Sequence, residues 1–377
     1  MNDFCGQFDV IVIGAGPAGM AMSARMGKHG ISHVVLEQGN RVAWRWQRHY
    51  RRLHLHTHKD YSELPGKAFP KDYPAYIGRS DLIRYFDGYA EVNRIRPRFG
   101  ATVSRVERAG DHWRVLTDQE EFQGRHVVMA TGKNNLLRGF KVKGLESFSG
   151  TLVHSRDYTS AADYNVGSAL VIGAGNTGAE LALDLSEHAI RTSLCVRSPT
   201  YVVPREFLGS SIQVTSIRLA KLPNGLRDAL SNITIKLAMG NLEPWGITRP
   251  KMSIRKHMET TGRVPVIDIG TVAAIKAGNI KVVKGLESVE GKTVTFADGS
   301  NDEFDLIVVA TGYKTGLEKL LATPENYIGK DGFPLADHFD DGLHFLGYRD
   351  MGLGILYMIG RVSGEILERV GGVKPSK

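Results

Sequence analysis

The sequence predicts an α/β fold made of two similar halves, and two observations support this prediction. The first is a βαβ pattern near the N-terminus, where an apolar strand, a glycine-rich turn, a helix and a second strand follow one another over residues 8–37. The second is a repeated order of features along the 377 residues. A glycine-rich turn, a meander of strands and the tripeptide Ala-Thr-Gly occur over 14–132 and again over 173–312. This repeat indicates two Rossmann-like dinucleotide-binding domains, each with an inserted β-meander.

The first glycine-rich turn, residues 14–19, has the pattern of a dinucleotide phosphate site. Gly14 allows the tight turn, Gly16 lets the backbone approach a pyrophosphate, and Gly19 lets the helix lie close to the strand. Glu37 follows the second strand at the spacing of a carboxylate that binds ribose hydroxyls, which favours FAD or NAD over NADP. The cofactor contacts expected from this unit are Gly14, Gly16, Pro17, Ala18, Gly19, Glu37 and Gln38.

The second glycine-rich turn, residues 173–178, differs from the first at an informative place. Arg197 and Ser198 stand where Glu37 closes the first unit. A guanidinium there grips a 2′-phosphate, which a carboxylate would repel, so this unit is expected to prefer NADPH; an ordinary surface arginine is the alternative. The cofactor contacts expected here are Gly173, Gly175, Asn176, Thr177, Gly178, Arg197 and Ser198.

The remaining periodic segments complete this plan. Strands are expected at 101–107, 112–117, 126–129, 169–172, 192–196, 281–283, 293–296 and 306–309. Helices are expected at 20–28, at 179–186, from an N-cap at Ser80 through Tyr89, and over 352–370. The dipole of the last helix would stabilise an anionic reduced flavin if its N-terminus abuts the flavin pyrimidine.

Within residues 51–58, leucines alternate with histidines, which predicts an extended segment with His54, His56 and His58 on one face and Leu53 and Leu55 on the other. Three histidines suggest a metal, but no carboxylate or cysteine cluster joins them. Histidines that face the cofactor, or that are simply exposed, are therefore the preferred interpretation, and no metal site is predicted.

Residues 205–242 are predicted to form a helical insert. Its apolar residues recur at intervals of three or four and are Leu219, Leu222, Leu226, Leu230, Ile233 and Leu237. Such an insert packs over a substrate cavity, forms a dimer face or lies on a membrane; packing over the cavity is the simplest of these interpretations.

Composition excludes several other classes. A net charge of +8 accompanies scattered Lys and Arg residues with no basic run that alternates with aromatics, so no nucleic-acid partner is expected. The two cysteines, Cys5 and Cys195, form no CxxC motif, which argues against a dithiol mechanism and for a reducing compartment. No signal peptide or membrane-spanning apolar run is seen, and a cytoplasmic protein without firm membrane association is predicted. The sequence leaves open whether the protein forms a homodimer.

Residues 148–158 are similar to the FxGxxxHxxx(aromatic) signature of class B flavin-dependent monooxygenases, with His154 as its histidine. A hydrogen bond to the backbone at the domain junction is the alternative role for this histidine. Further segments resemble the YUCCA branch of the flavin-containing monooxygenases, and the likeness covers nearly the entire chain. These segments are 46–47, 53–56, 197–198, 203–206, 249–251, 265–270 and 310–313.

The resemblance implies that NADPH reduces FAD, that O₂ forms a flavin C4a-(hydro)peroxide, and that one oxygen atom passes to a small organic substrate. It also makes His56 and Asn176 the candidate catalytic residues. Many flavin-containing monooxygenases have an asparagine where this chain has His56, which weakens the analogy with amine and sulfide oxygenation. Tyr158-Thr159 replaces the Trp-Pro of Baeyer–Villiger enzymes. The further cofactor contacts that the resemblance implies are Trp46, His54, His56, His154, Thr311 and Gly312.

The sequence therefore predicts an NADPH- and FAD-dependent monooxygenase. The YUCCA likeness points to oxidative decarboxylation of a 2-oxo acid such as indole-3-pyruvate. The alternatives are N-, S- or C-oxygenation of a compound such as indole, and an NADPH-dependent flavin reductase or electron-transfer protein. The expected FAD-binding domain comprises residues 1–162 and 312–377, and the expected NADPH-binding domain comprises residues 163–311.

Overall fold

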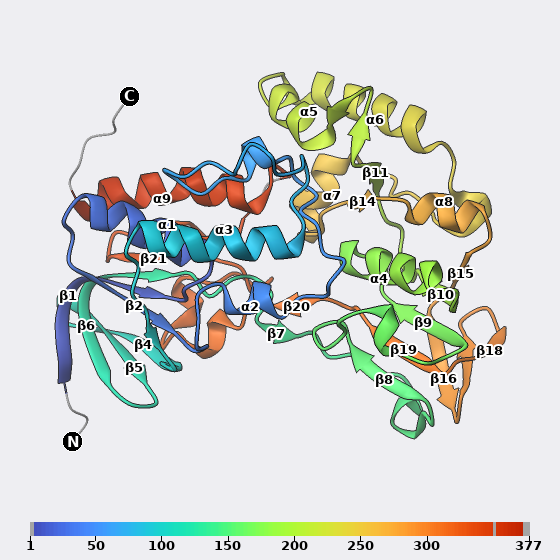
Figure 1. Ribbon diagram of the computed structural model, residues 1–377, viewed down its shortest axis with the longest axis horizontal. Coiled ribbons are helices and arrows are strands. Elements are labelled where there is room, and N and C mark those ends of the chain that lie inside the picture. The colour runs from blue at the N-terminus through green and yellow to red at the C-terminus, as the bar shows by residue number, and fades with distance from the viewer. Residues whose placement is uncertain (1–3, 350–351, 372–377) are drawn as a thin grey trace. The chain divides into compact units, whose positions relative to one another are not determined.

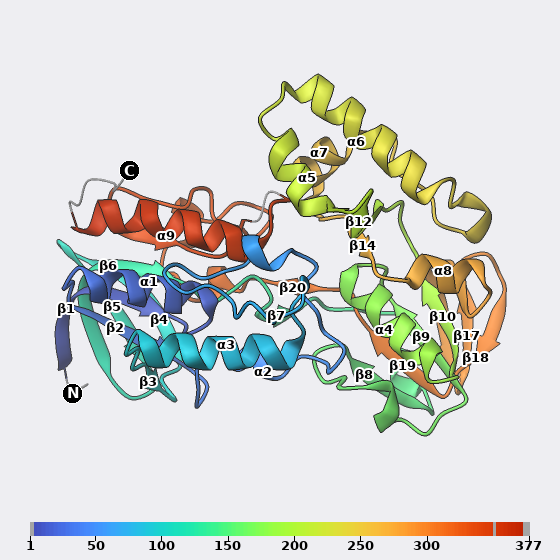
Figure 2. The same cartoon turned by 45° about the horizontal axis from the view of Figure 1, so that its top comes forward.

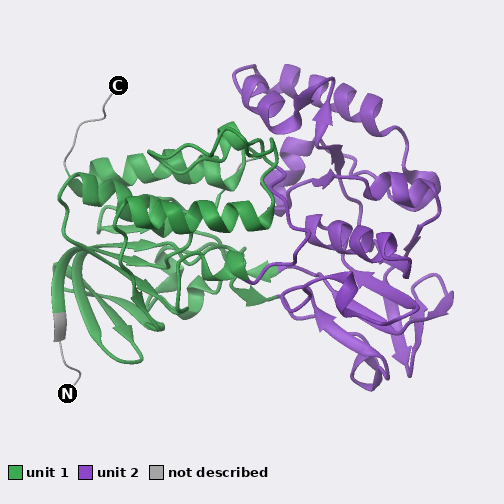
Figure 3. Ribbon diagram, viewed as in Figure 1, with its two compact units in different colours: residues 1–47, 57–137, 313–377 green, residues 48–56, 138–312 purple. Residues whose placement is uncertain are grey.

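The computed structural model describes residues 4–349 and 352–371 (Figure 1). The chain divides into two compact units, each assembled from segments that are far apart in the sequence (Figure 3). Unit 1 comprises residues 1–47, 57–137 and 313–377, and unit 2 comprises residues 48–56 and 138–312.

Unit 1 contains a seven-stranded mixed sheet with the order β3-β2-β1-β6-β5-β4, and β21 pairs with β6. Its strands are β1 (Phe4–Ile13), β2 (His33–Glu37), β3 (Arg98–Phe99), β4 (Val103–Ala109), β5 (His112–Thr117), β6 (Glu121–Met129) and β21 (Leu343–Phe345). β1 is parallel to both β2 and β6, so Ile13 lies opposite Leu36 on one side and Met129 on the other. The antiparallel strands β4 and β5 continue the sheet beyond β6, which confirms the predicted meander.

Three helices of unit 1 lie side by side (Figure 2). The helices of this unit are α1 (Pro17–Lys28), α2 (Trp44–Gln47), α3 (Arg79–Val92) and α9 (Ile355–Gly371), with 3-10 turns η1 (Lys59–Tyr61), η5 (Leu317–Lys319) and η6 (Pro324–Asn326). α1 packs between α3 and α9, and Arg25 fastens α1 to α9 by donating a 2.9 Å hydrogen bond to the Gly360 carbonyl. α3 begins earlier than predicted, because Gly78 and not Ser80 occupies the N-cap.

Unit 2 is built on a parallel five-stranded sheet with the order β15-β10-β9-β19-β8. These strands are β8 (Thr151–His154), β9 (Ser168–Ile172), β10 (Arg191–Cys195), β15 (Ile280–Val283) and β19 (Leu306–Val309). The covering helices are α4 (Asn176–Glu187) and α8 (Thr271–Lys276). A separate antiparallel meander follows, made of β16 (Leu286–Glu290), β17 (Thr293–Phe296) and β18 (Asn301–Glu303). The predicted βαβ unit and meander are therefore present a second time.

The units differ from the expected domain boundaries at two segments and at Gly312, which belongs to unit 2. Residues 138–162 belong to unit 2, because β8 pairs in register with β19 at the edge of the unit 2 sheet. Residues 48–56, which we call the strap, also belong to unit 2, although the chain on both sides of them belongs to unit 1. Tyr50 of the strap is buried in the main apolar core of unit 2, which accounts for this assignment.

The insert of unit 2 is less helical than predicted at its start. It opens with the strand β11 and the hairpin β12–β13, continues as helices, and ends with β14, which pairs with β11. Its elements are β11 (Val202–Pro204), β12 (Glu206–Phe207), β13 (Ser210–Ser211), α5 (Ile212–Leu219), α6 (Asn224–Met239), α7 (Ile254–Thr261) and β14 (Val266–Asp268). The shorter elements elsewhere are β7 (Leu136–Leu137), β20 (Tyr313–Lys314), η2 (Leu145–Ser147), η3 (Ala161–Asp163) and η4 (Glu243–Trp245).

The prediction of an extended segment at 51–58 is wrong. Residues 51–58 form turns and bends with no named strand, because local backbone bonds such as Leu53 N–H to the Tyr50 carbonyl fold the chain back on itself. The alternation of leucine and histidine did not decide the structure here, because Tyr50 and Leu53 pack on the core of unit 2.

Unit 1 contains a histidine cluster around buried His344 of β21, with half-buried His126 of β6 and His338 beside it. His126 Nδ1 and His344 Nε2 are 3.2 Å apart, the two rings stack, and the His338 ring packs against His344 with 6.0 Å between ring centroids. Burial, with smaller contributions from His126, His338 and Arg369, lowers the pKa of His344 to about 3, and burial also lowers the pKa of His126. Both imidazoles are therefore neutral at physiological pH.

This cluster predicts acid lability. In the unfolded chain a histidine takes up a proton near pH 6.5, whereas native His344 stays neutral until about pH 3, so the unfolding free energy falls as the pH drops through this window. We expect His344→Leu to remove about 3 kcal/mol of the stability loss between pH 7 and pH 4, measured by urea unfolding at each pH. His29→Leu, at an exposed histidine, serves as the control. Parallel pH profiles for His344→Leu and the native protein would show that His344 titrates normally.

Candidate functional site

The first glycine-rich turn joins β1 to α1 and leaves no room for a side chain at two positions. Gly14 has φ +107°, and a Cβ there would lie 2.6 Å from the Ala130 carbonyl oxygen. A Cβ at Gly19 would collide with the carbonyl oxygen of Gly14. These contacts draw the start of α1 tightly against the ends of β1 and β6, the strands between which the order of the sheet reverses.

Gly16 is different, because a Cβ there would meet no atom of the described residues within 4 Å. Gly16 is the N-cap of α1, its end of the helix has no side-chain cap, and Pro17 occupies the first turn. The helix N-terminus is thus open toward this free space, as an anion-binding turn requires. The free space at Gly16 fits a pyrophosphate. The close contacts at Gly14 and Gly19 instead hold the turn against the strands and are needed for the fold.

Glu37 is buried at the end of β2 and already holds the turn together. Its Oε2 accepts a 2.8 Å hydrogen bond from the Ala15 N–H, and its Oε1 accepts one of 2.8 Å from the Gly39 N–H. A carboxylate has about four acceptor positions, so Glu37 retains capacity for ribose hydroxyls. The neighbouring Gln38 is exposed, and Trp46 packs edge-on against Phe86 of α3.

The second turn repeats this geometry in unit 2. Gly173 has φ +113°, and a Cβ there would lie 2.5 Å from the Ala310 carbonyl oxygen. A Cβ at Gly178 would collide with the Gly173 carbonyl. Gly175 is the N-cap of α4 without a side-chain cap, and its added Cβ would find nothing in the described structure within 4 Å. The second open helix N-terminus therefore has the same fit to a phosphate group as the first.

The repeated Ala-Thr-Gly tripeptides lie directly against these turns. Ala130 and Ala310 supply the carbonyl oxygens that exclude a side chain at Gly14 and Gly173. The threonine that follows each alanine makes its own contact. In unit 1, the hydroxyls of Thr131 and Tyr348 share a 2.7 Å hydrogen bond.

The second tripeptide ends in a residue with a conformation that favours glycine. Gly312 has φ +91°, and Thr311 before it donates a weak 3.4 Å hydrogen bond to the Arg138 carbonyl. Thr311 and Gly312 thus follow directly after Ala310, the alanine that packs on the second turn. The sequence predicts both of them as cofactor contacts.

Asn176 and Thr177 begin α4, but the Asn176 amide is already engaged. Its Nδ2 donates to the Pro265 carbonyl at 3.1 Å, and its Oδ1 accepts the Ile267 N–H at 2.7 Å. Asn176 thus fixes β14 to the N-terminus of α4. This use of both amide ends is that of a positioning residue, and it differs from the catalytic role expected from the sequence.

Arg197 follows β10 and is exposed, with Ser198 half-buried beside it. The aliphatic part of Arg197 passes over Gly285, where a Cβ would lie 3.4 Å from Arg197 Cγ. The side chain is therefore directed along the surface of unit 2, and its guanidinium is available to an anionic group.

His56 of the strap is bound to α4. Its Nε2 lies 2.5 Å from Oε1 of Glu180, a carboxylate that is 2% exposed. Among the described residues, Oε2 of Glu180 has no hydrogen-bond partner. His54 is exposed, and its Nδ1 is 2.6 Å from the Arg52 carbonyl. The structure thus separates two histidines that the sequence placed on one face.

Glu180 belongs to an acidic row on α4 that sequence reasoning missed. Asp184, one turn later, accepts the Tyr158 hydroxyl at 2.6 Å and the Ala161 N–H at 2.9 Å, and Glu187 pairs with Arg52 of the strap. Three acids at positions i, i+4 and i+7 of a largely apolar helix were the signal available in the sequence. The row anchors the strap and the segment after β8 to the helix that begins at the second turn.

His154, at the end of β8, is held in one tautomer. Its Nδ1 accepts a 3.0 Å hydrogen bond from the Arg156 N–H. Burial, with the nearby Arg156 charge, lowers its pKa, so the ring is neutral and its proton resides on Nε2. The backbone contact that the sequence allowed for this residue is therefore present.

Comparison with known proteins assigns the chain to a family. Residues 11–205 match the family model described as pyridine nucleotide-disulphide oxidoreductase. Indole-3-pyruvate monooxygenase YUCCA1 of Oryza sativa subsp. japonica is 35% identical over 91% of this chain and 87% of its own length. Indole-3-pyruvate monooxygenase YUCCA6 of Arabidopsis thaliana is also 35% identical, over 91% of this chain and 86% of its own length.

The chain belongs to the YUCCA-like branch of the flavin-containing monooxygenases. Solved structures agree with the fold. The flavin-containing monooxygenase from Stenotrophomonas maltophilia superposes with a TM-score of 0.71 at 21% identity, covering 98% of this chain and 99% of that one. The OTEMO complex with FAD and NADP gives 0.68 at 18% identity, over 97% of this chain and 85% of that one.

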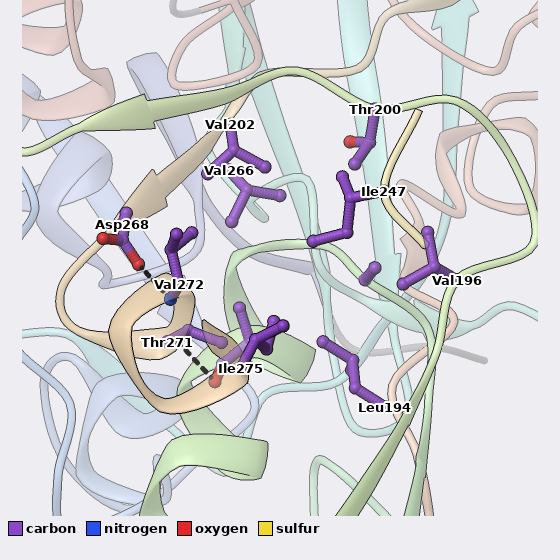
Figure 4. Close-up of a pocket in the computed structure, with 12 residues that line it drawn as sticks. Leu194, Val196, Thr200, Val202, Ile247, Val266, Asp268, Thr271, Val272 and Ile275 are labelled. Carbon is purple, nitrogen blue, oxygen red and sulfur yellow. Dashed lines mark hydrogen bonds between the residues drawn. The ribbon is translucent and has the colours of Figure 1, made fainter. Parts of the chain in front are cut away.

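A small apolar pocket of this YUCCA-like chain lies beside the second turn (Figure 4). It is lined mainly by aliphatic side chains, with Val196 next to Arg197 in the sequence and Ala174 from the turn itself. Its Asp268 accepts the Val272 N–H at 2.9 Å, and its Thr271 donates to the Ala179 carbonyl at 3.0 Å. Because these polar groups are engaged, the pocket offers apolar contacts rather than reacting groups.

Metal binding and membrane spanning find no support in residues 4–349 and 352–371. None of the helices in these ranges combines the length and the apolar character needed to cross a membrane. Over the same ranges, no group of three or more His, Cys, Asp or Glu side chains is arranged to hold a metal ion.

Proposed function

We propose that this chain is an NADPH- and FAD-dependent monooxygenase that oxidatively decarboxylates a 2-oxo acid, with indole-3-pyruvate as the first candidate. The observation that supports it best is the pair of open helix N-termini at Gly16 and Gly175, followed by an acid in one unit and an arginine in the other. The curated relatives named above are indole-3-pyruvate monooxygenases, which supports the substrate class.

The proposed reaction balances with one substrate, one O₂, one NADPH and one proton. One oxygen atom enters the new carboxylate, the original carboxylate leaves as CO₂, and the second oxygen atom becomes water while NADPH becomes NADP⁺. When bound, FAD supplies the two-electron chemistry that connects NADPH to O₂. The chain's own part is to bind and orient both nucleotides and to exclude water.

FAD is assigned to unit 1 and NADPH to unit 2. In unit 1, the α1 N-terminus holds the pyrophosphate and Glu37 the adenosine ribose. In unit 2, the α4 N-terminus holds the pyrophosphate and Arg197, aided by Ser198, grips the 2′-phosphate. The residues that complete the two sites are Pro17, Ala18, Gln38 and Trp46 for FAD, and Thr177, Thr311 and Gly312 for NADPH. A cytoplasmic location is part of the proposal, because the sequence has only two cysteines, Cys5 and Cys195, far apart along the chain, as is typical of proteins from a reducing compartment.

The test is substrate-stimulated NADPH oxidation by the yellow holoprotein. We expect indole-3-pyruvate to raise the NADPH oxidation rate and to yield one indole-3-acetate per NADPH, while indole and simple amines yield no oxygenated product. Product from indole or an amine but none from any 2-oxo acid would replace the proposed substrate class. NADPH oxidation that passes electrons to an added acceptor without any product would favour the reductase alternative.

We expect Glu180 to affect the efficiency of oxygen transfer through its contact with His56. Loss of the Glu180 carboxylate removes the hydrogen bond that fixes His56 and the strap on α4. A larger share of the consumed O₂ is then released as hydrogen peroxide and does not reach the substrate. We expect Glu180→Leu, which has no acceptor for His56, to raise hydrogen peroxide released per NADPH by about tenfold, with FAD content unchanged, because a loosened site admits water. Glu187→Leu breaks an exposed contact of the same strap and should change the ratio by less than about twofold. Equal effects of both variants would show that His56 needs no such anchor.

A further inference from the structure

Helix α6 has two apolar faces, and only one of them is covered by the described residues. Ile235 and Met239 are buried in the core of unit 2, where α6 packs on β11 and α7. The opposite face carries four large apolar side chains that are between 37% and 72% exposed. They are Leu226, Leu230, Ile233 and Leu237, which we call the α6 stripe.

The α6 stripe is continuous and convex. Its residues follow one another at spacings of four, three and four, so they form one line about 17 Å long on the helix surface. Figure 2 shows α5 and α6 at the edge of unit 2, away from its five-stranded sheet. The sequence-based interpretation of these residues as packing over a cavity is therefore wrong for the stripe, because Ile235 and Met239 make the inward contacts instead.

The insert around the stripe is strongly basic. Residues 205–265 contain ten Lys and Arg against four Asp and Glu, so they carry +6 of the chain's net charge of +8. Asp228, the one acid on α6, is paired with Arg255 of α7 at 3.1 Å. The exposed basic side chains near the stripe include Lys221 and Lys236. A line of aliphatic side chains flanked by cations is the pattern of a helix that lies in the surface of an anionic bilayer.

We propose that the α6 stripe is a docking surface for an anionic lipid membrane, on which the insert lies with Leu226, Leu230, Ile233 and Leu237 among the upper acyl chains. A second copy of the chain fits less well, because pairing two stripes would bring two inserts of charge +6 together. A bilayer also accepts a convex aliphatic surface without a matching groove. The stripe shares no residue with the two phosphate turns, so the proposal does not depend on the substrate.

The experiment is vesicle flotation of the holoprotein. We expect binding to vesicles that mix phosphatidylcholine with phosphatidylglycerol, little binding to pure phosphatidylcholine, and release at high salt. Leu230→Asp combined with Ile233→Asp should reduce the bound fraction by about tenfold or more. Val92→Asp, at a 71% exposed apolar residue of α3 in unit 1, is the matched control and should bind like the native protein.

Charge is tested separately. Lys221→Gln combined with Lys236→Gln should weaken binding by about tenfold, whereas Lys330→Gln in unit 1 should change it little. Unchanged flavin content and NADPH oxidation in all variants would show that they are folded. The proposal is overturned if the native protein ignores anionic vesicles. It is also overturned if the native protein sediments as a dimer that the stripe variants convert to monomers, because the stripe would then be a self-association surface.

Discussion

We expect Gly16→Val to give a folded protein that purifies without yellow colour. Gly16 has extended backbone angles that valine adopts readily, and no atom of the described residues lies within 4 Å of its added Cβ. The new side chain would instead fill the space assigned to the FAD pyrophosphate and cover the N–H groups of α1. FAD affinity should fall by more than about a hundredfold, measured by flavin fluorescence titration of apoprotein.

Two other glycines of α1 make this test specific. Gly27 has equally open surroundings within 4 Å in the described structure but lies far along the helix, so Gly27→Ala should stay yellow and equally stable or more so. Gly19→Ala should instead destabilise the protein itself, because its Cβ would collide with the Gly14 carbonyl. A Gly16→Val protein with native flavin content would show that the FAD phosphates are held elsewhere.

Arg197→Ala should raise the KM for NADPH by about a hundredfold and leave the KM for NADH nearly unchanged. The guanidinium is exposed at the end of the strand that follows α4 and is expected to make paired, charge-assisted hydrogen bonds to the 2′-phosphate, which NADH lacks. The measurement is steady-state oxidation of each nucleotide by the FAD-loaded variant.

The matched control for this prediction is Arg263→Ala, which removes another exposed arginine of unit 2. It lowers the net charge by the same amount, so it reports any general electrostatic effect on anionic nucleotides. Equal increases of KM for NADPH and NADH in Arg197→Ala, or an equal response of Arg263→Ala, would remove Arg197 from the 2′-phosphate site.

The doubled fold follows from the sequence because its signals are local and mutually consistent. In each unit the first glycine of the turn is required, because a carbonyl oxygen of the unit's own Ala-Thr-Gly tripeptide leaves no room for a side chain. The carbonyl of Ala130 faces Gly14, and the carbonyl of Ala310 faces Gly173. The repeated order of turn, meander and tripeptide in the sequence therefore reflects a contact in the fold, between the ends of neighbouring parallel strands. The helix and strand positions around these turns agree with their predictions to within a few residues.

The features that sequence reasoning missed depend on contacts between distant segments. The strap has the alternation of a strand, but Tyr50 is drawn into the core of unit 2 and His56 is bound by Glu180, 124 residues away. Likewise, the leucine spacing predicts α6 but not its orientation, because both faces of this helix carry apolar residues. Buried Ile235 and exposed Ile233 lie only two positions apart.

The most direct test of the central claim is a single-turnover experiment under ¹⁸O₂. Holoprotein, NADPH and indole-3-pyruvate are mixed in the presence of catalase, which removes any peroxide that would decarboxylate the 2-oxo acid without the enzyme. We predict indole-3-acetate that contains one ¹⁸O atom per molecule, formed in a one-to-one ratio with the NADP⁺ produced. NADPH consumption with no labelled acid, and with half of the consumed O₂ returned by the catalase, would contradict the assignment of this chain as a 2-oxo acid monooxygenase.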